Sequence, residues 1–145
     1  MTLVNRLTTA VLAALAALHV AWGLGSAFPF RNRDDLADAV VGSSIVPPAG
    51  SCYAVAGALA IGAGLVAQAG PLPPRLRRTL LLGMAGVLGL RGALGLAGAT
   101  ELISPGSNSE RFLRLDRRLY APLCLGLAVG SLAARGRSDG RGRPA

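Results

Sequence analysis

The sequence predicts an all-α fold, an integral membrane four-helix bundle made from one domain in a chain of 145 residues. Hydrophobic residues make up 52% of the chain and charged residues 15%, whereas soluble globular proteins carry about 25% charged residues. Aromatic residues contribute only 4%, so the apolar content is mainly Leu, Ala, Val and Gly. Twenty glycines would weaken helices in water, but helices packed in lipid use small residues for close contact.

Four apolar runs form the predicted membrane domain, which covers residues 1–134. The expected spans are residues 7–25, 52–70, 79–100 and 119–134. The first run has 19 residues and would rise about 28 Å as an α-helix, close to the roughly 30 Å hydrocarbon core of a bilayer. An alternative for this run is a cleaved signal peptide, because Arg6 precedes it and Gly25-Ser26-Ala27 follows it.

Small residues in the runs favour close helix packing. Ala56, Ala60 and Gly64 of the second run are spaced four apart, a pattern that lets two backbones approach each other. In the third run, glycine occurs at every third position from residue 83 to residue 98. A step of three residues lags one helical turn by about 60°, so this stripe winds around the helix and predicts more than one neighbour.

Polar links and a basic tail separate or follow the runs. Within the first link, residues 34–41 fit either a short helix at the membrane surface or a solvated loop. The second link, residues 101–119, contains the turn signal of residues 105–109. Residues 135–145 form a Gly/Arg-rich tail that we expect to be disordered.

The chain has a net charge of +8, and the positions of its arginines indicate how this charge lies relative to a membrane. All fifteen basic residues are arginines, and all except Arg91 stand in the links and the terminal segments and not along one helical face. This distribution excludes nucleic acid as the expected partner and indicates a lipid bilayer. Eight arginines fall on the side of both termini and six on the other side, which predicts a multi-pass cell-membrane protein with cytoplasmic termini. Oligomeric state is not predicted by this pattern.

The chain offers little for cofactor or metal chemistry. Cys52 and Cys124 are too few for a disulfide framework, they lie outside any C-x-x-C motif, and whether they pair is left open. One histidine and two cysteines do not provide the usual zinc ligands, and we expect no metal and no cofactor. The sequence also lacks a nucleotide-binding loop and an H-E-x-x-H motif.

Several polar residues fall in the outer half of the predicted bundle, beside or within the spans. They are His19, Trp22, Arg91, Glu101, Asp116, Arg118 and Tyr120. An ion inside a membrane is costly unless it is paired, so Arg91 marks a hypothetical functional site. His19, Arg91, Glu101, Asp116 and Tyr120 would then line an outward-facing pocket between four helices.

One interpretation of this cluster is catalytic. Glu101, Asp116 and His19 would be the catalytic residues, because a site with both burial and a nearby arginine can hold one protonated acid beside one carboxylate. The substrate-binding residues would be Arg91, Trp22, Tyr120 and Arg118. The reaction would be proton transfer on a lipophilic small-molecule substrate.

A structural interpretation of each residue stands beside the catalytic one. Arg91 could snorkel to the headgroups or pair with Glu101, and Asp116 could pair with a nearby arginine. His19 could hydrogen-bond a neighbouring carbonyl group. Trp22 and Tyr120 could anchor the chain at the membrane interface.

Three parts of the sequence carry a resemblance to a known family. They are His19-x-x-Trp22-Gly23, the intramembrane Arg91, and Phe112-x-x-Leu115-Asp116-x-Arg118-Leu119-Tyr120-x-Pro122-Leu123-Cys124. With these motifs the chain resembles a family of small actinobacterial four-helix membrane proteins of unknown function. That resemblance implies a four-helix architecture in which the polar cluster is a family feature, and it implies no activity.

A second likeness concerns size and number of spans. In these respects the chain is similar to small bacterial membrane-bound terpene cyclases. This likeness implies that Glu101 or Asp116 protonates a prenyl double bond while Trp22 and Tyr120 shield a carbocation. The sequence therefore supports two alternative functions: a membrane enzyme acting on an isoprenoid substrate, and a non-catalytic assembly partner or small carrier whose polar cluster is structural.

Overall fold

The regular elements of the chain are all helices in residues 1–135, the part that the computed structural model describes. The long helices are α1 (Leu3–Gly23), α3 (Ala49–Ala67), α4 (Pro74–Ala97) and α6 (Ala121–Arg135). Within the described residues, α1, α3 and α4 are long and apolar enough to cross a membrane. The predicted all-helical fold is confirmed, and these three helices indicate a membrane protein.

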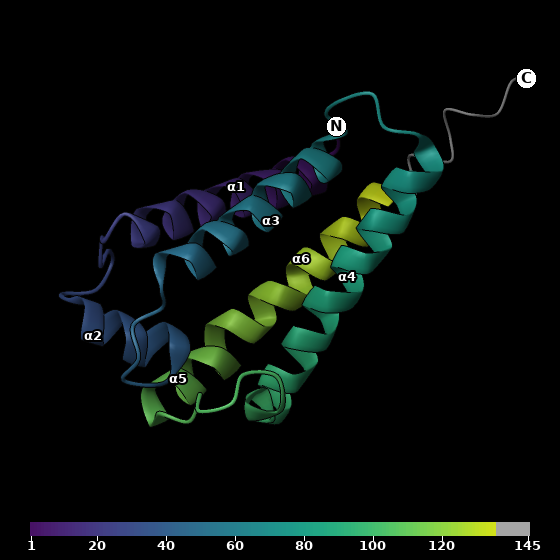
Figure 1. Ribbon diagram of the computed structural model, residues 1–145. Coiled ribbons are helices and arrows are strands. Elements are labelled where there is room, and N and C mark those ends of the chain that lie inside the picture. The colour runs from purple at the N-terminus through teal and green to yellow at the C-terminus, as the bar shows by residue number, and fades with distance from the viewer. Residues whose placement is uncertain (136–145) are drawn as a thin grey trace, which may run out of the picture.

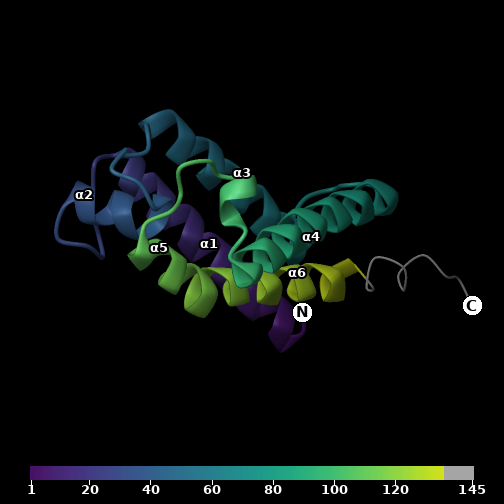
Figure 2. The ribbon, with the colours of Figure 1, turned by 90° about the horizontal axis from the view of Figure 1, so that it is seen from below.

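The long helices form two antiparallel pairs (Figure 1). α1 packs mainly on α3, and α4 packs mainly on α6. The pairs are inclined to each other in both views (Figures 1 and 2), and they meet chiefly where α1 contacts α6. At that contact a Cβ atom on Gly130 would overlap the Thr8 side chain, so the missing side chain lets the two helices touch. All four helices contribute to one apolar core, which includes Leu12, Val66, Leu81 and Leu127.

Both polar links lie at the same end of the bundle, opposite the N-terminus (Figure 1). The first link contains α2 (Arg33–Leu36) and the π-helical turn η1 (Ala37–Val41), so residues 34–41 are helical as one of the two interpretations predicted. The second contains a 3-10 turn, η2 (Thr100–Leu102), then α5 (Glu110–Leu115) and a second π-helical turn, η3 (Asp116–Tyr120). α5 packs on η1, which joins the two links into a cap over the bundle.

Hydrogen bonds fix the two links to each other. The backbone N–H groups of Asn108 and Ser109 donate to the carbonyl oxygen of Gly42, at 3.1 and 3.0 Å. The Ser109 hydroxyl donates to the carbonyl oxygen of Asp38 at 3.0 Å. Gly42 has φ +78°, and a Cβ there would lie 2.8 Å from the Phe112 ring. Glycine is therefore needed at this position for both its backbone conformation and its lack of a side chain.

The helix boundaries differ from the predicted spans for local reasons. α3 ends at Ala67 and not at residue 70, because Gln68 adopts a left-handed conformation and its N–H closes the last turn. α4 begins at Pro74, before the predicted residue 79, since proline is tolerated in the first helical turn. It ends at Ala97 because Gly98 is left-handed, with φ +71°.

The fourth helical segment extends further toward the N-terminus than the predicted span of residues 119–134. α5, η3 and α6 follow one another without interruption from Glu110 to Arg135. Pro122 has no N–H to donate and its ring crowds the preceding turn, and the wider π-helical turn of η3 directly precedes it. α6 itself has 15 residues, fewer than α1, α3 or α4. Beyond Arg135, the tail that was predicted to be disordered lies outside the described residues.

Two arginines satisfy carbonyl groups at the C-terminal ends of helices. The Arg77 guanidinium of α4 donates to the carbonyl oxygens of Leu65, Ala69 and Gly70, at 3.4, 3.4 and 2.9 Å. Arg33 of α2 donates to the carbonyl oxygen of Trp22 at 3.3 Å. A guanidinium suits these positions because the last carbonyls of a helix lack intrahelical donors and carry partial negative charge.

Candidate functional site

The strongest polar interaction in the described bundle joins α4 to the start of the last helical segment. Arg91 donates to both carboxylate oxygens of Asp116, from Nη2 to Oδ1 at 2.7 Å and from Nη1 to Oδ2 at 3.2 Å. Asp116 has no exposed surface, while the Arg91 side chain is 26% exposed. This two-pronged geometry is the most favourable one for an arginine–carboxylate pair.

Thr100 completes the site from the 3-10 turn that follows α4. Its hydroxyl donates to Oδ2 of Asp116 at 2.5 Å, and the residue is buried. Each carboxylate oxygen therefore has at least one donor, which is the condition for burying a charge at acceptable cost. We call Arg91, Thr100 and Asp116 the polar clamp.

Two glycines of the third run make room for the polar clamp. A Cβ atom on Gly95 would lie 2.8 Å from Arg91 Nη1, 2.8 Å from the Cβ of Ala121 and 3.0 Å from Asp116 Oδ2. A Cβ on Gly92 would lie 2.9 Å from the carbonyl oxygen of Ala121. By contrast, a Cβ on Gly83 or Gly86 would meet no atom within 4 Å. The glycine stripe thus serves close packing at its C-terminal end, where α6 approaches α4.

Arg91 lies nearer the end of its helix than the predicted span implied. It stands six residues before Ala97, or about 9 Å along the axis, and its guanidinium reaches one turn further, to the level of Gly95. The predicted alternatives for Arg91 were snorkelling and pairing with Glu101. The side chain does extend toward the helix end, but its partner is Asp116.

Glu101 and Arg118 stand apart from the polar clamp. Both residues are exposed, and neither forms a hydrogen bond or an ion pair within the part of the chain that the structure describes. Glu101 follows Thr100 in η2, where the chain has already left α4. Its carboxylate therefore does not join that of Asp116 as the two-acid hypothesis expected.

His19 and Trp22 belong to the other helix pair. The two rings are in contact, with centroids 4.7 Å apart, as their spacing on one face of α1 predicted. His19 Nδ1 lies 2.8 Å from the carbonyl oxygen of Leu15 in the same helix, and Trp22 Nε1 donates to the carbonyl oxygen of Phe28 at 2.7 Å. Trp22 is buried against Leu36 and Cys52 beneath the cap. This arrangement matches the structural interpretation of His19 as a residue that bonds a nearby carbonyl.

Tyr120 connects the two polar links. Its hydroxyl donates to the carbonyl oxygen of Ala39 in η1 at 3.0 Å, and its ring lies 6.2 Å from that of Phe112 between centroids. Arg111, at the start of α5, reaches carboxylate oxygens of Asp35 at 3.5 Å and Asp38 at 3.7 Å. Tyr120, which was predicted to bind substrate or to anchor the chain at the membrane interface, thus holds the cap together with Arg111.

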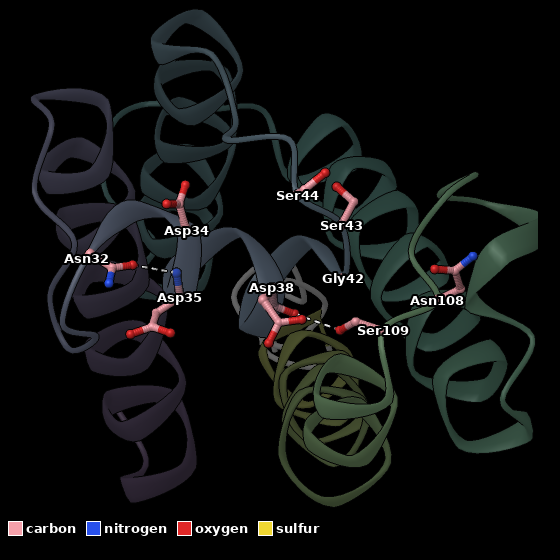
Figure 3. A pocket seen from close by; sticks show the side chains of 9 residues that line it. All are labelled: Asn32, Asp34, Asp35, Asp38, Gly42, Ser43, Ser44, Asn108 and Ser109. Carbon is pink, nitrogen blue, oxygen red and sulfur yellow. Dashed lines mark hydrogen bonds between the residues drawn. The ribbon is translucent and has the colours of Figure 1, made fainter.

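An acidic groove opens in the cap, and none of the residues of the polar clamp lines it (Figure 3). It encloses about 540 Å³ and is lined by Asn32, Asp34, Asp35, Asp38, Gly42, Ser43, Ser44, Asn108 and Ser109. An apolar groove of about 280 Å³ lies between α1 and α6 and is lined by residues such as Val11 and Leu123. Neither groove is lined by His19, Glu101 or Asp116, so the two described grooves differ from the pocket that the sequence predicted.

The two cysteines lie on different helices and do not form a disulfide bond. Cys52 is a buried free thiol in α3, and Cys124 is a partly buried free thiol in α6. In residues 1–135, no group of three or more His, Cys, Asp and Glu residues is arranged to hold a metal ion.

Sequence reasoning missed two of the residues that shape these interactions. Thr100 gave no signal, because a single threonine in a link is common and its partner lies sixteen residues away. Arg77 of α4 was used only in the count of arginines that predicts orientation in the membrane, although its side chain is buried against the C-terminal end of α3. Arg77 is one of three arginines close together, with Arg75 and Arg78, and the sequence does not distinguish the arginine that caps a helix from those that face solvent.

The fold and the polar clamp define a small α-helical membrane protein with a buried arginine–aspartate pair between two helices. The chain belongs to the family described as "Protein of unknown function (DUF3995)", whose family model matches residues 12–131. The match includes all three residues of the polar clamp, and it agrees with the predicted membership of a family of unknown function. Comparison with curated proteins and with solved structures gave no match.

Proposed function

We propose that the chain is a non-catalytic, four-span membrane protein that serves as an assembly partner within the bilayer, and that the polar clamp fastens its helices. The observation that carries this proposal is the complete burial of Asp116, whose two oxygens are both engaged by Arg91 and Thr100. A carboxylate enclosed in this way is suited to holding two helices in register. A catalytic acid must instead contact its substrate.

The outer surface of the bundle supports a role in assembly. Only 22% to 33% of the residues in the apolar stretch of each candidate span are buried inside the chain, so each helix keeps surface that can face lipid or another protein. Exposed glycines such as Gly57 and Gly86 stand on these outer faces with no neighbouring atom near the position of a Cβ. Small residues on lipid-facing helices are the common means of close helix association in membranes.

We further propose that the fourth span is formed by η3 and α6 together and that both termini lie in the cytoplasm of a cell-membrane protein. In the whole sequence, the side of both termini carries eight arginines and the capped end carries six, which are Arg31, Arg33, Arg111, Arg114, Arg117 and Arg118. Arginines near span ends favour the cytoplasmic side. A reporter fused to the C-terminus that is active only outside the cytoplasm would contradict this orientation.

The catalytic hypothesis, acid/base chemistry on a lipophilic substrate such as isoprenoid cyclisation, makes a different prediction for the two acids. In the assembly proposal, Asp116→Asn removes the charge that holds Arg91 and lowers the yield of folded protein in detergent. Glu101→Gln changes an exposed residue without an ion pair, so the variant folds like the wild type. Size-exclusion chromatography and circular dichroism of both variants measure this contrast.

The wild type and the Glu101→Gln variant also test for turnover. Wild-type protein and Glu101→Gln would be incubated with isoprenoid diphosphates and with membrane lipid extract, and the products analysed by mass spectrometry. We expect no conversion that depends on the protein. A product formed by the wild type and lost in a normally folded Glu101→Gln variant would overturn the non-catalytic proposal.

A further inference from the structure

Two guanidinium groups lie along the last turns of α4, where glycines leave the helix surface bare. Arg91 lies over Gly95, as its contact with the position of a Gly95 Cβ shows. Arg117 lies over Gly98, where a Cβ would overlap its guanidinium. Gly95 and Gly98 are three residues apart, or about 4.5 Å along the helix axis. The end of α4 therefore presents two cationic groups at adjacent levels.

Both guanidinium groups have unused hydrogen-bond donors. Arginine has five N–H donors, and within residues 1–135 the hydrogen bonds of Arg91 all go to Asp116, through two of these donors. Its side chain is 26% exposed, so the other donors face outward in part. Arg117 is exposed and makes no hydrogen bond or ion pair with the described residues. The single negative charge of Asp116 compensates the positive charge of Arg91, to which it is bonded. The positive charge of Arg117 has no such compensation from this carboxylate.

The position of these donors relative to the membrane indicates which anion they meet. α4 is a candidate membrane span, and it ends at Ala97 beside the polar link. The end of a span lies near the polar headgroups of the lipids. Guanidinium groups match the oxygens of a phosphate in charge and geometry. We infer that Arg91 and Arg117 bind the phosphate of an anionic phospholipid in the leaflet at the C-terminal end of α4, a role beyond the proposed assembly function.

Neighbouring charges act on this lipid site in both directions. Glu101 follows Thr100 directly and its exposed carboxylate would repel a phosphate. Arg118 is exposed next to Arg117 and adds positive charge without a glycine-lined position of its own. A specific site therefore depends on Arg117 more than on Arg118, and it gains from the loss of the Glu101 charge. Attraction by the summed positive charge alone would treat the two arginines alike.

The test is lipid retention by the full-length protein in detergent, measured by native mass spectrometry during titration with phosphatidylglycerol. We expect Arg117→Gln to lower the affinity about tenfold, the effect of losing one charge-assisted contact. The matched control Arg118→Gln should change affinity less than about twofold, and Glu101→Gln should increase it. Circular dichroism checks that the exposed substitutions leave the fold intact.

Two further titrations identify the ligand. Phosphatidylcholine should bind more weakly than phosphatidylglycerol, and excess inorganic phosphate should leave the bound lipid in place. Equal losses in Arg117→Gln and Arg118→Gln would overturn the site. Equal binding of the two lipids, or displacement of phosphatidylglycerol by inorganic phosphate, would also overturn it, the latter by assigning the site to a free anion.

Discussion

The two helix pairs are held together by different kinds of interaction. α3 contains no charged residue, and its contact with α1 and the core depends on apolar side chains such as those of Leu12, Ala63 and Val66. α4 and the last helical segment share the polar clamp, with its buried ion pair and hydroxyl group. Apolar contacts between helices compete with lipid tails that are equally apolar. A buried ion pair has one favourable arrangement, so it sets the register of α4 against α6 more sharply than packing sets α1 against α3.

The largest expected effect comes from removing one partner of the ion pair. Asp116→Leu leaves Arg91 without its carboxylate and should destabilise the α4–α6 pair by about 3 kcal/mol, the low end for a broken buried pair, because the remaining guanidinium is 26% exposed. The free thiols offer one probe in each pair, Cys124 in α6 and Cys52 in α3. In detergent, labelling of Cys124 by a maleimide should accelerate in the variant, with Cys52 much less affected.

A double substitution separates the charge from its packing. Arg91→Leu combined with Asp116→Leu removes both ions, and apolar replacements of a buried pair are often close to neutral. We expect the double variant to recover most of the slow labelling of Cys124. If the two substitutions destabilise additively, the ion pair does not couple the helices and the contrast between the pairs is wrong.

An intermediate effect is expected from filling the space beside the polar clamp. Gly95→Ala places a methyl group 2.8 Å from Arg91 Nη1 and from the Ala121 Cβ, which should cost about 1–3 kcal/mol. Gly86→Ala is the matched control in the same helix, because its methyl group meets no atom within 4 Å. Unfolding in sodium dodecyl sulfate, followed by circular dichroism, should have its midpoint lowered only for Gly95→Ala. A similar fall for Gly86→Ala would indicate a general intolerance of α4 and not a need for space at the polar clamp.

The smallest effect is expected at the cap, where the polar link that follows α1 contacts the polar link that follows α4. Tyr120→Phe retains the ring and removes the hydrogen bond to the Ala39 carbonyl, for a loss of about 1 kcal/mol. Amide hydrogen exchange in η1 should become faster while exchange in the middle of α4 is unchanged. Tyr53→Phe, at a half-exposed position of α3, serves as the control and should leave exchange in η1 unaltered. Unchanged η1 exchange in Tyr120→Phe would show that this hydrogen bond does not hold the cap.

The sequence predicted the membrane class because span length and apolar content depend on local composition. It also identified Arg91 as a costly ion and Asp116 as the partner of an arginine. It did not predict that Glu101 lies apart from them, because the left-handed Gly98 ends α4 and the following 3-10 turn places Thr100 on the carboxylate instead. Nor did it predict which helices pair, since each run is apolar around most of its circumference and its pattern favours no neighbour.

The separation of 25 residues between Arg91 and Asp116 has a consequence for biosynthesis. While α4 enters the bilayer, its arginine has no carboxylate, because Asp116 follows 25 residues later and is still inside the ribosome when Arg91 emerges. An arginine at the centre of an inserting helix opposes insertion by about 2.5–3.5 kcal/mol, and less near the helix end where this one lies. We therefore expect α4 and α6 to be integrated together as a helical hairpin, whereas the uncharged α3 can be integrated alone.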